Sequence, residues 1–406
     1  MDKKSKILLS FVLFLCLVLF VSPHTSYAKD VTQGIDAKEK VIKVGAYVPE
    51  SGPVPFYMRI CFGAMTRFYW QNDQGGIGGW KIDFLTRDDG YQASRTVAVT
   101  KQLVERDKVF ALGSNIGTPN SIAVLPYIKE VGIPTVGPVG ASPKFTNPVI
   151  PNMFTLLPDY TWEAERAAQY LVEKLGIKKI GVLYENDDLG IPGFKGVKAY
   201  LKTKNLEVVG GLPFDVTEID FSSYAFKMKE AGAEGVCLWG SNKNVTSFAR
   251  EGAKIGYKPV IFAYAFVSDP TTFKLAGDIL DDRFYVPSWM MPLSSTDRNM
   301  QVFKEALKKY FPREDVGFFP MNGYSHASVL IRGIEKALEK KKKLTWENLI
   351  EGLNSIKDEK IGLVGSVTYS PNDHAGVKKT AILKAVKGEM VQVTEFEPNP
   401  AIVPTD

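Results

Sequence analysis

Two pairs of adjacent acidic residues, Asp88-Asp89 and Asp187-Asp188, are the side chains best suited to acid–base chemistry. Each pair follows an apolar run that is typical of a buried strand. Adjacent side chains seldom converge on one substrate atom, and acids just after a strand commonly form turns or cap helices. We therefore expect structural roles at both pairs instead of general acid–base catalysis.

Other reactive side chains are few and far apart. After residue 28 the histidines are His326 and His374 and the cysteines are Cys61 and Cys237, too sparse for a transition-metal site or a disulfide framework. The chain lacks a serine-centred nucleophile elbow. Its glycine-rich run at 75–79 precedes a strand, whereas a dinucleotide-binding loop joins a strand to a helix. The sequence predicts a protein that is not an enzyme, with no cofactor and no metal.

The beginning of the chain predicts export. A lysine-rich start precedes the apolar run 7–21, and Ser26-Tyr27-Ala28 places small residues at the two positions that a signal peptidase reads. The run is shorter than the about 20 apolar residues of a membrane-spanning helix, so an uncleaved anchor is the weaker alternative. We expect a signal peptide over residues 1–28, cleavage after Ala28 and a location in the periplasm.

Short apolar strands alternate with amphipathic helices in two similar units. In the first unit, strands are expected at 41–48, 81–87, 109–113 and 133–136, with helices at 57–73, 93–106 and 119–130. In the second, strands at 179–184, 206–209, 235–239 and 259–263 alternate with helices at 160–175, 194–203, 222–231 and 243–255. Helices at 297–310, 321–340 and 345–353 follow, then a hairpin of 380–386 with 390–393. The pattern predicts an α/β fold of two doubly wound, Rossmann-like lobes, with a ligand cleft beyond the carboxyl ends of the strands.

The overall charge does not point to a charged macromolecular partner. The 406-residue chain carries a net charge of +5 with both signs well mixed, so neither nucleic acid nor an anionic membrane is implied. The one basic run, Lys340 to Lys343, closes an amphipathic pattern and is expected to be a solvated helix end. Two lobes around a cleft, without visible catalytic groups, favour a binding protein over an enzyme.

An ordered set of strings from about residue 41 to 395 resembles the periplasmic substrate-binding proteins of branched-chain amino acid (LIV-type) ABC transporters, which belong to the type I periplasmic binding protein family. Ile42-Lys43-Val44-Gly45 with Ser51-Gly52-Pro53 is similar to the opening strand and first cleft loop of that family. The run 72–79, followed by Lys81-Ile82 and Asp88-Asp89, is similar to its next helix, turn and strand. Further matching strings are 132–138, 184–190, 220–223 and 256–259.

The resemblance implies two lobes joined by three crossovers, near Leu157, Tyr285 and Gly376. Lobe 1 would hold residues 42–157 and 286–375, and lobe 2 residues 158–285 and 376–398. Hinge closure over a small ligand would be stabilised by contacts from both lobes. The closed protein, a monomer in this family, would then dock on a membrane permease.

In lobe 1 the resemblance places the carboxylate of the ligand at two helix starts, where free N–H groups favour an anion. The matching positions are Ile116-Gly117-Thr118 and Gly140-Ala141-Ser142, with Tyr57 and Phe319 as aromatic residues beside the ligand. Thr118 and Ser142 would also serve as N-caps, and packing is the alternative role for Tyr57. Arg59 would pair with a carboxylate or, as we expect, with a surface acid.

Lobe 2 departs from the amino-acid-binding pattern. The family places an acid that pairs with the ligand's ammonium in the loop after 259–263. Here that loop has Ala265 at its centre, and Asp269 comes too late. A buried ammonium without an anionic partner would cost several kcal/mol. The positions that would face the ligand are instead aromatic, apolar or amide: Leu189, Trp239, Asn242, Tyr264 and Phe266.

Alternatives stay open at this half of the site. Trp239 and Phe266 would otherwise pack in the core, and Asp187 or Asp188 would restore an amino-acid ligand if either turned into the cleft. The resemblance implies a solute-binding protein that delivers a small carboxylate to an ABC importer. Its ligand is either a branched-chain or other apolar amino acid, or an aromatic or aliphatic acid. The alternative from another class is a sensory module that presents its ligand to a membrane receptor.

Overall fold

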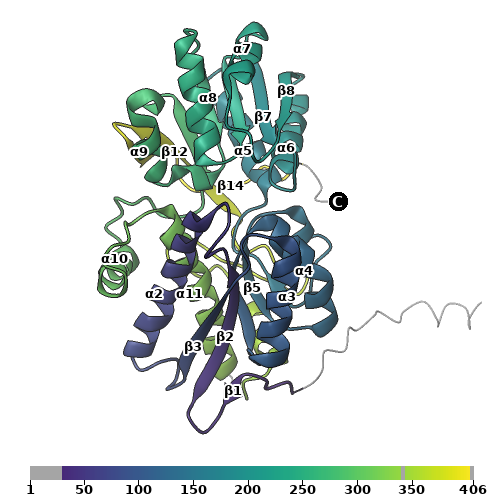
Figure 1. Cartoon of the computed structure of the whole chain (residues 1–406), viewed down its shortest axis with the longest axis vertical. Helices are drawn as coiled ribbons and strands as arrows, with labels where there is room; N and C mark the ends of the chain where they lie inside the picture. The colour runs from purple at the N-terminus through teal and green to yellow at the C-terminus, as the bar shows by residue number, and fades with distance from the viewer. Residues whose placement is uncertain (1–29, 340–342, 403–406) are drawn as a thin grey trace, which may run out of the picture.

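The computed structural model describes residues 30–339 and 343–402, and the expected signal peptide lies outside the described residues. The described chain forms two α/β lobes stacked along the long axis of the molecule (Figure 1). No helix in these ranges combines the length and the apolar character that crossing a bilayer requires. The fold class expected from the sequence is confirmed.

Lobe 1 is built on a six-stranded sheet of β1 (Ile35–Asp36), β2 (Val41–Val48), β3 (Lys81–Asp88), β4 (Ala111–Ile116), β5 (Thr135–Val139) and β6 (Met153–Phe154). β2 pairs in parallel with β3 and β4, β5 pairs in parallel with β4 and β6, and β1 is antiparallel to β2. Its helices are α2 (Met58–Asp73), α3 (Ala93–Lys101), α4 (Thr118–Val131), α10 (Arg298–Tyr310), α11 (Phe318–Glu339) and α12 (Trp346–Asn354). Parallel strands are covered on both faces, which explains why every residue of β4 is buried.

Lobe 2 is built on an eight-stranded sheet of β7 (Ile180–Glu185), β8 (Val208–Phe214), β9 (Gly235–Trp239), β10 (Val260–Ala263), β11 (Phe284–Ser288), β12 (Lys379–Val386), β13 (Glu389–Gln392) and β14 (Glu397–Pro398). The order is β13-β12-β11-β10-β9-β7-β8, with β14 paired to β12. Strands β7 to β11 run parallel, and β12 and β13 form the expected antiparallel hairpin. The helices of this lobe are α5 (Tyr160–Glu173), α6 (Gly190–Thr203), α7 (Ser222–Glu230), α8 (Asn242–Lys254) and α9 (Thr271–Ala276).

Short helical turns lie mostly at the ends of these elements. They are η1 (Pro55–Tyr57), η2 (Gln102–Arg106), η3 (Pro143–Phe145), η4 (Ala265–Ser268) and η5 (Gly277–Leu280). Two of them, η1 and η4, follow β2 and β10 at the end of each sheet that faces the other lobe. They therefore lie where a ligand between the lobes would bind.

Helices α2 and α11 cross at close range in lobe 1. A Cβ added to Gly63 would lie 1.8 Å from the carbonyl oxygen of Pro320, and one added to Gly323 would lie 1.8 Å from that of Ile60. Neither position therefore admits a side chain at this separation. The contact fixes the start of α2 against the start of α11, and both helix starts reach the space between the lobes.

The chain passes between the lobes at three places, two of which are joined by backbone hydrogen bonds. The Thr155 N–H donates to the His374 carbonyl at 2.9 Å, and the Gly376 N–H donates to the Thr155 carbonyl at 2.9 Å. Thr155 and Ala375 accordingly form a parallel bridge just after β6 and just before β12. The first crossover, at Thr155, and the third, at Ala375, therefore run side by side as a two-stranded connection between the lobes.

Among the strands longer than two residues, β8 and β11 differ most from the sequence expectation. β8 extends to Phe214, whereas the sequence predicts a strand only at 206–209. The rest of the strand was missed because Gly210, Gly211 and Pro213 are uncommon in strands. A Cβ on Gly211 would meet the ring of Phe194 at 2.8 Å, so the glycine makes room for α6. β11 is not expected from the sequence at all. It keeps the second sheet continuous to Ser288, so the second crossover starts after that residue, whereas the resemblance places it near Tyr285.

Candidate functional site

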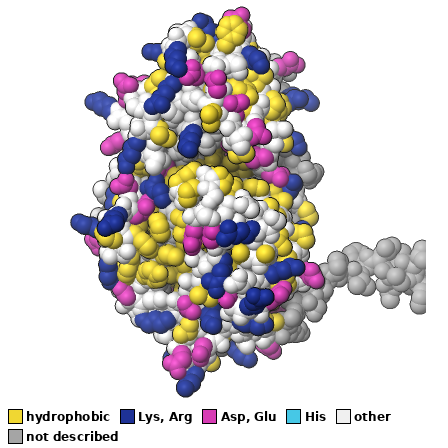
Figure 2. Space-filling model, in the orientation of Figure 1, with side chains coloured by type: hydrophobic (Ala, Val, Ile, Leu, Met, Phe, Trp, Pro, Cys, Tyr) yellow, Lys and Arg dark blue, Asp and Glu magenta, His cyan; other side chains and the backbone are white. Residues whose placement is uncertain are grey.

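A cavity of about 320 Å³, measured with its opening to solvent, lies between the two lobes. Its lining residues from lobe 1 are Tyr57, Ile60, Tyr91, Ile116, Gly117, Thr118 and Val139, and those from lobe 2 are Tyr160, Leu189, Tyr264 and Phe266. Figure 2 shows hydrophobic side chains at the waist between the lobes. The lining combines apolar side chains with phenol and threonine hydroxyls, and none of these described residues carries a charge.

The lobe 1 face is formed where β4 and β5 end and α4 begins. Gly117 joins β4 to α4 with φ at +109°, and a Cβ there would lie 2.7 Å from the Asn120 Oδ1 and 2.8 Å from the ring of Tyr91. Only glycine therefore fits without strain. Among the described side chains none caps this helix, and its first N–H groups lie beside the cavity at Thr118. A helix start of this kind favours an anion.

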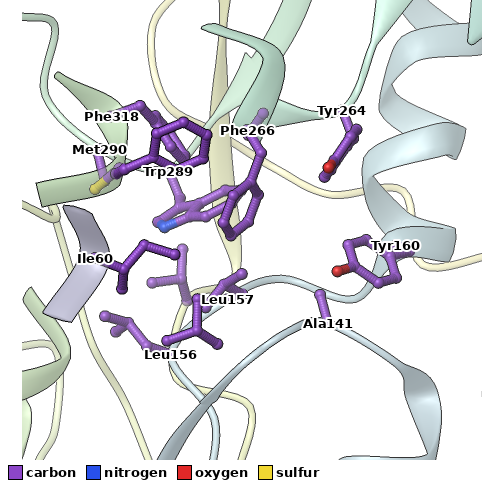
Figure 3. Close-up of a cluster of buried hydrophobic side chains, with 14 of the residues drawn as sticks. Ile60, Ala141, Leu156, Leu157, Tyr160, Tyr264, Phe266, Trp289, Met290 and Phe318 are labelled. Atoms are coloured by element: carbon purple, nitrogen blue, oxygen red, sulfur yellow. The ribbon is translucent and has the colours of Figure 1, made fainter. Parts of the chain in front are cut away.

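Four tyrosines give the cavity its hydroxyl groups. Tyr57 and Tyr91 have ring centroids 6.1 Å apart in lobe 1, and Tyr160 and Tyr264 have centroids 6.0 Å apart in lobe 2. Figure 3 shows Tyr160, Tyr264 and Phe266 around the same space. Burial raises the pKa of all four phenols above its ordinary value, so each stays a neutral donor and acceptor at neutral pH.

Hydroxyl groups also link the lobes across the cavity. The Thr118 Oγ1 on α4 lies 3.2 Å from the Tyr160 hydroxyl at the start of α5. The Tyr57 hydroxyl interacts with that of Tyr264. These contacts connect the two faces in the described structure, and hydroxyl groups can also donate to or accept from a ligand in the cavity.

Two buried acids lie behind the lobe 2 face without lining the cavity. Glu185 ends β7, and burial, then the neighbouring charge of Asp187, raises its pKa to about 8. Glu163 on α5 accepts a hydrogen bond from the Ala265 N–H at 3.2 Å, and burial raises its pKa well above the ordinary value. The Glu185 carboxyl is therefore mainly protonated near pH 7, and burial also disfavours the charged form of Glu163.

The turn and cap roles expected for the paired acids are found at Asp88, Asp89 and Asp187 but not at Asp188. Asp89 accepts from the Tyr91 N–H at 2.8 Å and from the Thr96 hydroxyl at 2.8 Å. Asp187 accepts from the Leu189 N–H at 2.8 Å at the start of α6. Asp188 pairs with Lys144 of lobe 1 at 2.7 Å, so it is engaged at the surface.

Arg59 and Asp269 form an ion pair between the lobes. The Arg59 Nη1 lies 2.8 Å from the Asp269 Oδ1, and its Nε also pairs with Glu314. Asp269 is fully buried, and its Oδ2 accepts from the Phe319 N–H at 3.3 Å. We call this group of Arg59, Asp269 and Phe319 N–H the interlobe clasp. Asp269 is therefore directed at lobe 1, and Arg59 pairs with acids as expected, although one of them is buried.

The cavity brings together six of the residues predicted from the sequence. These are Tyr57, Gly117, Thr118, Leu189, Tyr264 and Phe266. Phe319 lies behind this lining, with its ring centroid 5.6 Å from that of Tyr57. Ala141 is buried next to the cavity, where its carbonyl accepts from the Tyr160 N–H at 3.0 Å, and Ser142 is buried beside it.

Two predicted residues lie away from the cavity lining. Trp239 is fully buried in lobe 2, and a Cβ on Gly193 would lie 2.4 Å from its indole, so the ring packs under α6. Asn242 donates to the Thr272 hydroxyl at 2.6 Å and ties α8 to α9. The core position that the sequence analysis kept as the alternative for Trp239 is the one observed.

Ile116, which the resemblance also marks, lines the cavity, whereas four lining residues were not singled out from the sequence: Ile60, Tyr91, Val139 and Tyr160. Val139 is the last residue of β5, so the rule that ligands bind beyond the strand ends would have found it. Tyr160 follows the first crossover, where a residue must face both lobes. Tyr91 has φ at +58°, which no sequence signal shows.

With the geometry established, the chain can be compared with known proteins. A family model described as "Periplasmic binding protein" matches residues 41–389, and the chain belongs to this family. It is 22% identical over 308 residues to the Leu/Ile/Val-binding protein homolog 7 of Brucella abortus, covering 73% of this chain and 77% of that protein.

Two solved structures share the fold. One is the fatty acid ABC transporter substrate-binding protein from Thermomonospora curvata, with a TM-score of 0.82, 24% identity and coverage of 92% of this chain and 96% of that one. The other is a branched-chain amino acid ABC transporter protein from Thermus thermophilus with bound valine, with a TM-score of 0.82, 19% identity and coverage of 90% and 98%. The predicted resemblance to the LIV-type binding proteins is confirmed.

Proposed function

We propose that this protein is an extracytoplasmic solute-binding protein that delivers a small carboxylate without an ammonium group to an ABC importer. The observation that supports it most directly is the composition of the cavity. The start of α4 and neutral hydroxyls line one part, and the described lining offers no anionic partner for an amine. The ligand would be an aliphatic or aromatic acid, and the protein would act without catalysis.

The carboxylate would bind at the lobe 1 face. The N–H groups at the start of α4 and the hydroxyl of Thr118 supply donors there, and the neutral phenols of Tyr57 and Tyr160 supply further ones. A hydrogen bond to a charged group contributes about 1.5–3 kcal/mol, so two or three of them would compensate for removing a carboxylate from water. Leu189 and Phe266 would cover the apolar part of the ligand.

An amino acid fits this cavity less well. Ala265 stands where the family has an acid, and its N–H is directed at Glu163. Asp269 is held by Arg59, and the raised pKa of Glu185 keeps that carboxyl mainly neutral. An ammonium without an anionic partner would cost several kcal/mol. The named relatives include binding proteins for branched-chain amino acids and for a fatty acid, so both ligand classes occur on this fold.

Hinge closure would deliver the ligand to the permease. The proposed hinge is the set of three crossovers, with lobe 1 and lobe 2 moving about them as units. Contacts that span the cavity in the described structure, such as Thr118 with Tyr160 and Lys144 with Asp188, would form on closing. A ligand touching both faces would stabilise that state. The expected signal peptide and a monomeric state complete the proposal.

A calorimetric titration of the mature protein, beginning at Lys29, tests the ligand class. Two panels are compared: aliphatic and aromatic carboxylates, and apolar L-amino acids of matched size. A ligand at 100 times its dissociation constant adds about 2.7 kcal/mol of stability, so a thermal-shift screen can select candidates first. We expect binding only among acids without an amine. Tighter binding of leucine or valine than of the matched acids would overturn the ligand class.

A further inference from the structure

A second cavity lies beside the first, on the far side of an aromatic wall. Its empty space, counted together with the adjoining open solvent, is about 320 Å³, and it is lined by Ser268, Ser288, Met291, Pro292, Leu293, Phe318, Met321, Leu383 and Met390. We call this space the rear chamber. It is bounded by residues of η4, the segment after β11, the start of α11 and the β12–β13 hairpin.

The wall between the two cavities consists of three rings. Phe266 lines the first cavity and Phe318 lines the rear chamber, and their ring centroids are only 5.2 Å apart. Trp289 contacts both, at 6.1 Å from Phe266 and 5.4 Å from Phe318. Figure 3 shows these three rings gathered above Ile60 and Leu157. A change of rotamer at Phe266 or Phe318 would therefore join the two spaces.

The rear chamber is suited to hydrocarbon. None of its described lining residues is charged, and its two serines are engaged: Ser268 donates to the Ala265 carbonyl at 2.6 Å, and Ser288 donates to the Met290 carbonyl at 3.1 Å. Three of the lining residues are methionines, whose flexible thioethers adapt to chains of different shape. The two serine hydroxyls are the only polar side-chain groups in the described lining.

We propose that the rear chamber takes the alkyl tail of a long-chain carboxylate whose head group binds at the start of α4 in the first cavity. This inference rests on the proposed function, because it needs a carboxylate in the first cavity. Phe266 and Phe318 turn aside to let the tail pass, and the tail then contacts Met321, Leu383 and Met390. The protein's ligand class is accordingly a fatty acid and not a short acid.

The test is a series of saturated carboxylates from 4 to 14 carbons, each below its micelle concentration, titrated into the mature protein by calorimetry. Each methylene that enters the rear chamber should lower Kd about fourfold, until the tail fills it. Met390→Trp, which fills the chamber from β13, should remove this gain for long acids and leave the Kd of the short acids unchanged. Leu293→Trp fills the rear chamber from the segment after β11. It should likewise remove the gain in affinity for long acids and leave the Kd of the short acids unchanged.

Val391→Trp is the matched control, because Val391 follows Met390 on β13 and is 43% exposed on the outer face. Val391→Trp should change neither the Kd of the long acids nor that of the short acids. The inference is overturned if short acids bind and longer ones gain nothing, or if long acids keep their gain in both chamber-filling variants. If no carboxylate of any length binds, the proposed function itself fails. Melting temperatures of the three variants confirm that each is folded.

Discussion

The two faces of the cavity are built from similar elements but carry different chemistry. In lobe 1, η1 and the start of α4 present N–H groups and hydroxyls, whereas in lobe 2 the corresponding loop after β10 presents Tyr264 and Phe266. Asp269, the acid of that loop, is turned to lobe 1 and held by Arg59. The proposed ligand would place its carboxylate at lobe 1 and its apolar part against Leu189 and Phe266 of lobe 2. The largest consequences should come from changes that disturb this division.

The interlobe clasp should have the largest effect on stability. Arg59→Met leaves the buried Asp269 carboxylate without its cation, and breaking a buried pair in this way costs about 3–5 kcal/mol. The free energy of unfolding in urea should fall by that amount. Lys274→Met is the control, since it breaks the exposed interlobe pair with Asp315 and should cost less than about 1 kcal/mol. Equal losses in the two variants would show that Asp269 does not depend on Arg59.

An acid placed in the apolar face should reverse the ligand preference. Leu189 lines the cavity at the start of α6 and is half-buried. Leu189→Asp should weaken binding of amine-free carboxylates about 100-fold by charge repulsion and create measurable binding of apolar amino acids. Leu189→Asn has nearly the same shape without the charge, so it should not recruit amino acids. If both variants behave alike in calorimetry, charge does not determine the ligand class.

A side chain at Gly117 should damage the polar face. Gly117→Ala meets Asn120 and Tyr91 at a backbone φ of +109°, and strain of this kind costs about 1–3 kcal/mol. Carboxylate affinity should fall at least about tenfold as the start of α4 shifts. Gly256→Ala has a φ of +70° with nothing within 4 Å of the added Cβ, so it should lower stability slightly and leave Kd unchanged. An unchanged Kd in Gly117→Ala would place the carboxylate elsewhere.

The most gradual effect concerns pH. The pKa of Glu185 is raised to about 8 by burial and then by Asp187, so the folded protein binds a proton that the unfolded chain loses near pH 4.5. Stability that depends on this proton is present below pH 4.5 and is lost as the pH rises toward 8. Glu185→Gln should therefore flatten the decline in unfolding free energy over this range, by at most about 1.4 kcal/mol per pH unit. The exposed substitution Glu305→Gln should leave the decline unchanged.

Much of the fold could be predicted from the sequence because alternating apolar periods define strands and helices locally. The expected strand at 41–48 and helix at 57–73 agree with β2 and α2 to within one residue. β11 was not predicted because it has only five residues, including Pro287, and so gives a weak strand pattern. It forms a strand because it pairs with β10 and β12. Packing against distant strands decides such an element.

The candidate site was less accessible to sequence reasoning. Absence of an acid at Ala265 could be read from the pattern, but the partner of Asp269 lies more than 200 residues away at Arg59. The sequence could not show whether Trp239, at the end of β9, faces the cleft or the core. In the structure its indole packs against Gly193, which places it in the core. Contacts between distant segments, and the direction of a side chain at a strand end, need the folded structure.

The close crossing of α2 and α11 has a consequence for how wide a ligand this cavity can accept. Because Gly63 and Gly323 leave no slack between the helices, the distance from Ile60 to Phe318 is set by backbone and not by side chains. Substituting Ile60 or Phe318 alters the shape of the site without altering the distance between the two helices. An alanine at either glycine would force the starts of α2 and α11 apart. Designers who want a wider site should begin with that pair of glycines.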